Sequence, residues 1–420
     1  MAFREFTDPQ AVLASTTVVD RFLRYARIDT QSDETSDTCP STSKQFDLAR
    51  MLRDELEELQ GQDVVLDDNG YVTAVFPGTR EGRLGLVAHM DTAPQFTGTG
   101  VNPQLHASYQ GGPIEIGNGL TLDPTDNPDL AECIGDTIIT SDGTTLLGAD
   151  DKSGVAAIMS LLELLKQDPS IERPTLLVGF TPDEEIGRGA HRFPLDRFDA
   201  PAAFTVDGGF PGEMNVETFS ADRAKITFTG VSVHPGRAYG KLVNALTWAG
   251  EFLARLPRTE SPEGTREREG FFFPLGLTGD PARCTVDILL RDFDDHVLQQ
   301  RGDRLRAMAE GLRAEEPRLQ VDFEIEAQYR NMGNALKARP EIGETLQRAI
   351  EATGLTPRVA AIRGGTDGSQ LTAMGLPTPN MFAGGLNFHG PQEWISTRAM
   401  GLTVCTLANL VQLWKAPVSV

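Results

Sequence analysis

Apolar residues in the first half of the chain occur either in short runs or with helical spacing. Helical spacing, with an apolar residue every three or four positions, covers residues 16–28, 43–60 and 153–167. Short apolar runs that predict buried strands lie at 64–66, 72–76, 84–88, 176–180 and 202–206. Two more helices are expected near the end of the chain, at 342–353 and 397–414. Buried strands separated by helices predict an α/β fold in which helices flank both faces of the sheet.

The middle of the chain has a different pattern, in which polar and apolar residues alternate along several segments. Strands are expected at 223–229, 271–277, 284–290 and 320–326, and helices at 243–256 and 295–315. Their order is β-α-β-β-α-β, the order of a compact ferredoxin-like unit. The sequence therefore predicts an inserted second domain at 218–327, between two parts of a first domain at 1–217 and 328–420.

The composition is that of an ordinary soluble globular protein, with 40% hydrophobic and 23% charged residues among 420. The formal net charge is -22, so the chain should repel nucleic acid and anionic membrane surfaces. No apolar stretch is long enough to span a bilayer, and the first residues contain no apolar signal core. The four scattered cysteines form no CxxC pair and predict reduced thiols. We expect a cytoplasmic protein without nucleic-acid or membrane partners.

Residues that can bind metal lie in five separate short motifs, each close to the end of an apolar run. They are His89, Asp150, Glu185, Asp207 and His389. Four of them follow a predicted strand end or lie near one, and ligands in α/β folds collect at the carboxyl edge of the sheet. Two imidazoles and three carboxylates are enough for two Zn²⁺ ions if one carboxylate bridges them. The set therefore predicts a two-metal cleft and a hydrolytic reaction.

Each of these motifs has an ordinary explanation when it is taken alone. Asp91 can hold the far ring nitrogen of His89, but a histidine at this place can also simply end a strand. Asp150 and Asp151 place two negative charges side by side at the start of a predicted helix. The ordinary explanation is an acidic residue that caps the helix, and a cap needs only one of the two. The acidic run at 183–185 is typical of a solvated turn. The five motifs together, each at the edge of a loop, favour the metal site.

The motifs of the chain resemble those of the M20 metallopeptidases. The matching segments are HMDTAP, GADDKSG, TPDEEIGRGA, TVDGG, SVHPGRA, IRGGTDGS and NFHG. The resemblance covers nearly the whole chain, and the segments NPQL and TVDGG favour the tripeptide aminopeptidases within the family. It implies a zinc-peptidase-like mixed sheet flanked by helices, with the inserted domain as a lid. It also implies an enzyme that releases the N-terminal residue from tripeptides.

The same resemblance implies a role for each residue of the metal site. His89 and Asp207 would bind one of two Zn²⁺ ions, and Glu185 and His389 would bind the other. Asp150 would bridge the two ions.

Two neighbouring acids have catalytic roles in this interpretation. Glu184 would be the general base, which takes the proton from the attacking water and passes it to the departing amine. Asp91 would orient His89. The resemblance further implies that the peptide bond between Asp150 and Asp151 is cis.

Three residues outside the metal motifs are assigned to the substrate by the resemblance. His234, on the inserted domain, would reach the reacting carbonyl from a closed lid or from a partner subunit. Arg291 and Arg363 would grip the carbonyl or the terminal carboxylate of the peptide, since a guanidinium fits a carboxylate. The alternatives are an exposed loop histidine and arginines that brace a turn. A closed lid would admit only short peptides, and a homodimer through the lid domain is a further expectation.

Two other functions are compatible with parts of this pattern. A related M20 hydrolase, either a dipeptidase or an N-acyl amino acid deacylase, would have the same metal ligands. A non-catalytic binding protein on the same fold would have lost Glu184 or a ligand, and this chain retains all of them.

Overall fold

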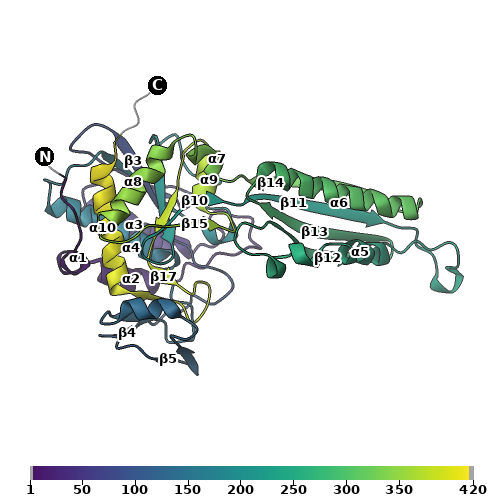
Figure 1. Ribbon diagram of the computed structural model, residues 1–420, viewed down its shortest axis with the longest axis horizontal. Helices are drawn as coiled ribbons and strands as arrows, with labels where there is room; N and C mark the ends of the chain where they lie inside the picture. Colours follow the sequence, from purple (N-terminus) through teal and green to yellow (C-terminus); the bar gives the residue numbers. More distant parts are fainter. Residues whose placement is uncertain (1–2, 416–420) are drawn as a thin grey trace. The chain divides into compact units, whose positions relative to one another are not determined.

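The computed structural model describes residues 3–415, so the outermost residues of the predicted first domain lie outside the described range. The described residues form two compact units (Figure 1). The first unit comprises the described residues up to Val216, Ala335–Ala360, and the described residues from Thr366 onward. The second unit comprises Glu217–Asn334 and Ala361–Gly365. None of the helices in the described range is long and apolar enough to cross a membrane.

The first unit is built on an eight-stranded mixed sheet with the strand order β1-β2-β8-β3-β9-β16-β10-β15. The strands are β1 (Gln62–Leu66), β2 (Val72–Phe76), β3 (Arg83–His89), β8 (Thr175–Thr181), β9 (Ala203–Gly208), β10 (Glu213–Thr218), β15 (Arg358–Ile362) and β16 (Asn380–Phe382). β3 pairs in parallel with β8 and β9, whereas the β1–β2, β2–β8 and β10–β16 pairs are antiparallel. β3 and β8 are each buried at six of seven positions. This burial explains why the sequence of each strand is a continuous apolar run.

Helices flank this sheet. They are α1 (Pro9–Ser15), α2 (Val18–Ala26), α3 (Gln45–Glu58), α4 (Ala149–Gln167), α8 (Pro340–Glu351), α9 (Asp367–Ala373) and α10 (Thr397–Leu413). α4 packs against β3 and β9, and both α2 and α10 pack on α4. A separate cluster of buried residues joins Val87 of β3 to Phe193, Phe198 and Leu371, the last of these from α9. The predicted α/β fold with a mixed sheet flanked by helices is confirmed.

Short strands add two small sheets to the first unit. One has the order β17-β18-β7-β4, and the other pairs β5 with β6. These strands are β4 (Gln104–His106), β5 (Ile114–Gly117), β6 (Leu120–Leu122), β7 (Ile138–Thr140), β17 (Gly385–Leu386) and β18 (Trp394–Ser396), and the 3-10 helix η1 (Pro128–Cys133) precedes β7. The sequence did not predict them, because strands of two to four residues are too short to show a period.

The second unit is a four-stranded antiparallel sheet with the order β12-β13-β11-β14. Its elements are β11 (Ser220–Thr229), α5 (Ala245–Ala254), β12 (Phe271–Gly279), β13 (Arg283–Asp292), α6 (Asp295–Glu315) and β14 (Gln320–Tyr329), with 3-10 turns η3 (Pro235–Arg237), η4 (Arg258–Glu260) and η5 (Pro262–Gly264). The short helix α7 (Gly333–Leu336) begins in this unit and ends in the first. Along β13 every second residue is buried, as expected for a sheet with one covered face. Phe252 of α5 and Leu305 of α6 pack with Ile288 of β13 in one core. From β11 to β14 the sheet and its two long helices follow the predicted order β-α-β-β-α-β.

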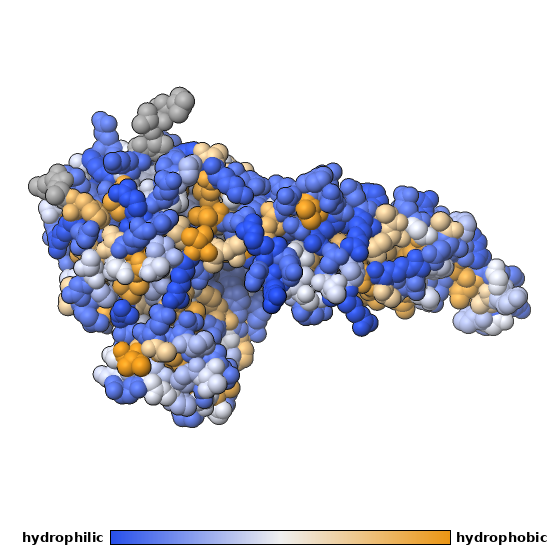
Figure 2. Space-filling model, viewed as in Figure 1, coloured by the Kyte–Doolittle hydropathy of each residue, from blue (hydrophilic) through white to orange (hydrophobic). Residues whose placement is uncertain are grey.

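Hydrophilic residues predominate on the visible face of each unit, with smaller apolar areas between them (Figure 2).

Candidate active site

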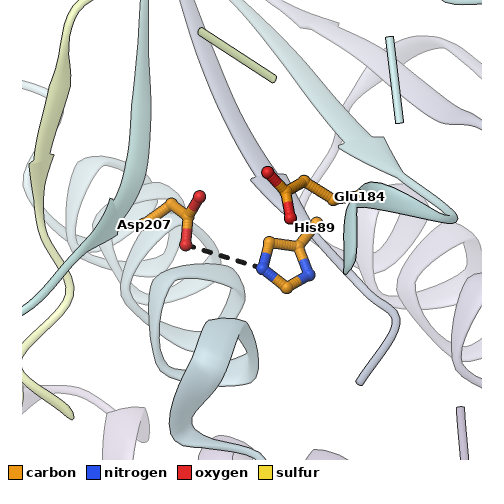
Figure 3. A group of neighbouring side chains, drawn as sticks. All are labelled: His89, Glu184 and Asp207. Carbon is orange, nitrogen blue, oxygen red and sulfur yellow. Dashed lines mark ion pairs between the residues drawn. The ribbon is translucent and has the colours of Figure 1, made fainter. Parts of the chain in front are cut away.

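The carboxyl ends of the central parallel strands bring three polar side chains together. β3 ends at His89, whose partner on β8 is Thr181. β8 leads into the 3-10 turn η2 (Glu184–Ile186), and β9 carries Asp207 near its end. Because β3 lies between β8 and β9, the side chains of His89, Glu184 and Asp207 form a group (Figure 3). One nitrogen or oxygen atom from each lies within 4.8 Å of the other two.

The carboxylate of Asp150 lies between two imidazole rings. Its Oδ1 is 2.9 Å from Nε2 of His89, and its Oδ2 is 3.2 Å from Nε2 of His389. Asp150 belongs to the first turn of α4, and His389 lies in the loop between β17 and β18. The peptide bond between Asp150 and Asp151 is cis, as the resemblance implied. This one carboxylate therefore presents one oxygen to each of two imidazoles.

Two further carboxylates complete the cluster. Oε2 of Glu185 is 2.9 Å from Nε2 of His389. Oδ1 of Asp207 is 3.5 Å from Nε2 of His89, the contact drawn as a dashed line in Figure 3. The structure therefore brings together all five residues that the sequence analysis named as metal ligands, although they come from five distant segments.

The donor atoms of this cluster fit divalent metal ions. Among the described residues, Oε1 of Glu185 is buried and has no hydrogen-bond partner, so one carboxyl oxygen is left for another ligand. Imidazole nitrogen and carboxylate oxygen are the atoms that hold Zn²⁺ in catalytic sites. The side chain of His89 is only 2% exposed. The sheet would therefore largely shield an ion bound to His89 from water.

Burial and crowding shift the titration of the cluster. Burial raises the pKa of Glu184 well above its ordinary value and raises the pKa of Glu185 to about 8. Burial acts in the same direction on Asp150, but hydrogen bonds to His389 and His89 hold the pKa of this carboxyl below its usual range. Hydrogen bonds to Asp150 and Glu185 raise the pKa of His389 to about 10. Cations among these groups would offset the repulsion between the carboxylates.

Asp91 contacts the cluster at more than one point. Its Oδ1 accepts a hydrogen bond from the backbone N–H of Glu184 at 3.0 Å, and its Oδ2 accepts one from that of Glu185 at 3.1 Å. Nδ1 of His89 lies 3.1 Å from the backbone carbonyl oxygen of Asp91 and 3.4 Å from its Oδ1. The resemblance implied only the contact with His89. The carboxylate also fixes the turn that presents Glu184 and Glu185.

Several buried acids around the cluster, among them Asp151, Asp183, Glu393 and Asp367, were not predicted to have a role. Asp151 accepts a hydrogen bond from the backbone N–H of His89, and Asp183 accepts one from that of Ser41. Glu393 accepts three hydrogen bonds from backbone N–H groups at and before the start of α4. Asp151 and Asp183 belong to acidic runs that the sequence analysis singled out, whereas Glu393 had no signal in the sequence.

His234, Arg291 and Arg363 lie in the second unit. His234 is exposed, and its Nδ1 accepts a hydrogen bond from the backbone N–H of Gly236. Arg363 donates to two backbone carbonyls and one hydroxyl in the segment 265–269. Arg291 donates to two backbone carbonyls of its own sheet. Both arginines therefore brace the backbone of this unit, and their contact with a peptide stays a prediction.

Comparison with known proteins decides the family. The sequence profile of "Peptidase family M20/M25/M40" matches residues 143–413. The "Peptidase T" of Geobacillus kaustophilus (strain HTA426) is 46% identical over 407 residues, which are 96% of this chain and 99% of that protein. The chain belongs to peptidase family M20/M25/M40. The predicted membership in the M20 metallopeptidases and the prediction of a metallo-aminopeptidase are confirmed.

Solved structures agree in fold. The aminopeptidase PepT from Bacillus cereus ATCC 10987 superposes with a TM-score of 0.72 at 22% identity and covers 94% of this chain and 97% of its own. A tripeptidase from Staphylococcus aureus subsp. aureus Mu50 superposes with a TM-score of 0.73 at 20% identity and covers 97% of this chain and 98% of its own. At these identities the two structures bear on the fold alone.

Proposed function

We propose that this protein is a di-zinc aminopeptidase that releases the N-terminal residue from tripeptides. The observation that carries the proposal is the carboxylate of Asp150, whose two oxygens face two different imidazoles, those of His89 and His389. The relative named Peptidase T supports the class of substrate.

The proposed ligands divide into two sets around Asp150. His89 and Asp207 would hold one zinc ion, Glu185 and His389 would hold the other, and Asp150 would contact both. When bound, the two ions lower the pKa of a water molecule towards neutrality and polarise the peptide carbonyl. Zinc is proposed because the donor set of imidazoles and carboxylates is the set that zinc prefers in hydrolytic sites.

Glu184 is the proposed general base. Its carboxylate groups with His89 and Asp207, whereas its neighbour Glu185 faces His389. Burial raises the pKa of Glu184, which makes its ionised carboxylate a stronger base towards the water. It would remove the proton from the attacking water and pass it to the nitrogen of the departing amine.

The assignment of Glu184 is tested by Glu184→Ala. This variant should keep the zinc content of the wild type and lose turnover by about 10²- to 10⁴-fold, the usual effect of removing a general base. Asp150→Ala should instead lose zinc together with turnover. Metal analysis and a kinetic assay on both variants measure this difference. An active Glu184→Ala protein would remove the base assignment, and full zinc occupancy in Asp150→Ala would argue against a bridge.

The class of substrate is tested with peptides of different length. We expect cleavage of tripeptides with a free amine, little cleavage of their N-acetylated forms, and none after chelation. The panel contains di-, tri- and tetrapeptides in both forms, assayed before and after treatment with a chelator. Product from dipeptides alone would indicate a dipeptidase, and product from acylated amino acids alone would indicate a deacylase.

We further propose that the second unit acts as a lid and as a dimerisation domain. It has its own core and carries the exposed His234, which would reach the reacting carbonyl, while Arg291 and Arg363 would hold the peptide. A lid excludes long substrates, so tripeptides should be cleaved much faster than decapeptides. Comparable rates on both would contradict the lid, and a monomer at all concentrations in solution would contradict the dimer.

The proposed location is the cytoplasm, and the proposed role is peptide catabolism. All four cysteines are free thiols, which is typical of a reducing compartment. The net charge of -22 argues against nucleic acid or an anionic membrane as a partner.

A further inference from the structure

A buried glutamate joins two of the segments that carry the proposed metal ligands. Glu393 is only 1% exposed. Its Oε2 accepts hydrogen bonds from the backbone N–H groups of Leu147 at 2.7 Å and Gly148 at 2.8 Å. Its Oε1 accepts one from the backbone N–H of Asp150 at 3.0 Å. One carboxylate therefore satisfies three N–H groups of the segment that leads into α4.

Glu393 comes from the segment that carries His389. It lies four residues after that histidine, and its own backbone N–H donates to the carbonyl oxygen of Gly390 at 3.3 Å, which closes a turn. The side chain of His389 is 41% exposed, in contrast to 2% for His89. The buried contact of Glu393 with the Asp150 segment is thus an anchor for a histidine that is itself half open to solvent.

The opposite side of the cluster has an anchor of its own. Oδ2 of Asp151 accepts a hydrogen bond from the backbone N–H of His89 at 3.3 Å, and Oδ1 accepts one from that of Gly154 at 3.1 Å. β3 and β9, which carry His89 and Asp207, are also paired directly in the parallel sheet. These contacts do not involve Glu393.

We propose that Glu393 is a positioning residue that holds His389 against Asp150 and thereby acts mainly on the affinity of one metal position. That position is the one formed by Asp150, Glu185 and His389. The position formed by His89 and Asp207 keeps its own anchors, so it depends on Glu393 only through the shared ligand Asp150. The inference rests on the two-ion site of the proposed function.

The charge and the two oxygens of Glu393 are both needed for this role. A glutamine of the same shape has one acceptor oxygen, and its NH₂ group would face backbone N–H donors on the other side. At least one buried N–H group would then lose its partner, and the remaining hydrogen bonds would no longer be assisted by charge. The segment of His389 should relax away from Asp150, while the segment of His89 stays in place.

The test is the binding of Zn²⁺ to the full chain after its metal has been removed. The wild type should take up two ions per chain. In Glu393→Gln one of the two ions should bind about 10- to 100-fold more weakly, the usual effect of removing a hydrogen-bond partner that orients metal ligands. The affinity of the other ion should change much less. Calorimetric titration gives both affinities, and Co²⁺ absorption spectra report separately which coordination sphere has changed.

Asp67→Asn is the matched control. Asp67 also accepts backbone N–H groups, those of Asn69 at 2.9 Å and Tyr71 at 3.0 Å, but it lies in the turn between β1 and β2. Both zinc affinities should be unchanged in this variant. If Glu393→Gln does not fold without metal, Glu393→Asp keeps the charge on a shorter side chain and should weaken the binding of the same ion to a smaller extent.

The outcomes separate this inference from the proposed function. A wild-type chain that binds fewer than two ions would overturn the two-ion site and this inference with it. Two ions in the wild type with unchanged affinities in the Glu393 variants would overturn this inference alone. Equal weakening of both ions in Glu393→Gln would also overturn it, because the effect would then be general rather than directed at the position of His389.

Discussion

At the scale of single residues, adjacent acids in this chain have different tasks because their side chains point to different neighbours. Glu184 groups with His89, whereas Glu185 contacts His389. Asp91 does not need to bind a metal ion to matter, since its two oxygens accept the backbone N–H groups of both glutamates. The geometry of the turn therefore depends on a carboxylate that comes from another strand end.

The role of Asp91 predicts the effect of Asp91→Asn. The amide keeps one acceptor oxygen, so one of the two N–H groups in the 184–185 turn loses its charged partner. We expect kcat to fall by about 10- to 100-fold while the protein stays folded. Kinetics and metal analysis measure this effect. Asp280→Asn is the control, because Asp280 likewise accepts two backbone N–H groups, but in the second unit. A kcat equal to that of the wild type would contradict the role of Asp91.

At the scale of elements, the site depends on the close approach of α4 to the sheet. The first turn of α4 carries Asp150, and the helix packs against β3 and β9. Gly154 makes this approach possible, because a Cβ atom there would lie 1.9 Å from the carbonyl oxygen of Val206 and 2.4 Å from Oδ1 of Asp151. Any larger residue would have to move the helix away from β9, the strand that carries Asp207.

Gly154→Ala should therefore destabilise the first unit. The expected loss in the free energy of unfolding is about 1–3 kcal/mol, the usual cost of overpacking, and zinc binding should weaken as well. Gly343→Ala, in α8 of the same unit, is the control. A Cβ atom there would meet only Cγ1 of Val216 at 3.4 Å, so alanine should stabilise the helix by up to about 1 kcal/mol. Urea unfolding of both variants gives the comparison, and equal stabilities would refute the argument.

At the scale of the whole molecule, the proposed metal ligands all belong to one of two compact units. The first unit contains His89, Asp150, Glu185, Asp207 and His389, and the second unit has a separate hydrophobic core. Crowded carboxylates in the first unit repel one another unless cations lie among them. Metal ions should therefore stabilise the first unit and leave the second unit unaffected.

This difference predicts how unfolding responds to zinc. Saturation at 100 times the dissociation constant should stabilise the first unit by about 2.7 kcal/mol for each ion, because the ion binds only the folded state. Trp248→Phe leaves Trp394 and Trp414, both in the first unit, as the fluorescent reporters of its unfolding. Their midpoint of thermal unfolding should rise with zinc and fall with a chelator. A midpoint that does not respond to either would contradict a metal site in this unit.

The sequence by itself determined the regular elements and the identity of the candidate ligands. The strand at 72–76 and the helix at 295–315 were predicted with the bounds that the structure has, because buried strands and long amphipathic helices have a clear pattern. The five candidate ligands, among them His89 and His389, could be named because metal-binding residue types stood at the ends of apolar runs.

Only the tertiary structure decided how these residues are held. The short strands β7 and β18 lie far apart in the sequence and pair with each other. Strands this short show no alternation of polar and apolar residues from which they could be predicted. Glu393 and Asp91 each accept hydrogen bonds from backbone N–H groups of distant segments. Every residue except proline has such a group. The sequence therefore contains no pattern from which these contacts could be predicted. The sequence determined which side chains can bind metal, and the folded chain decided which acids hold them in place.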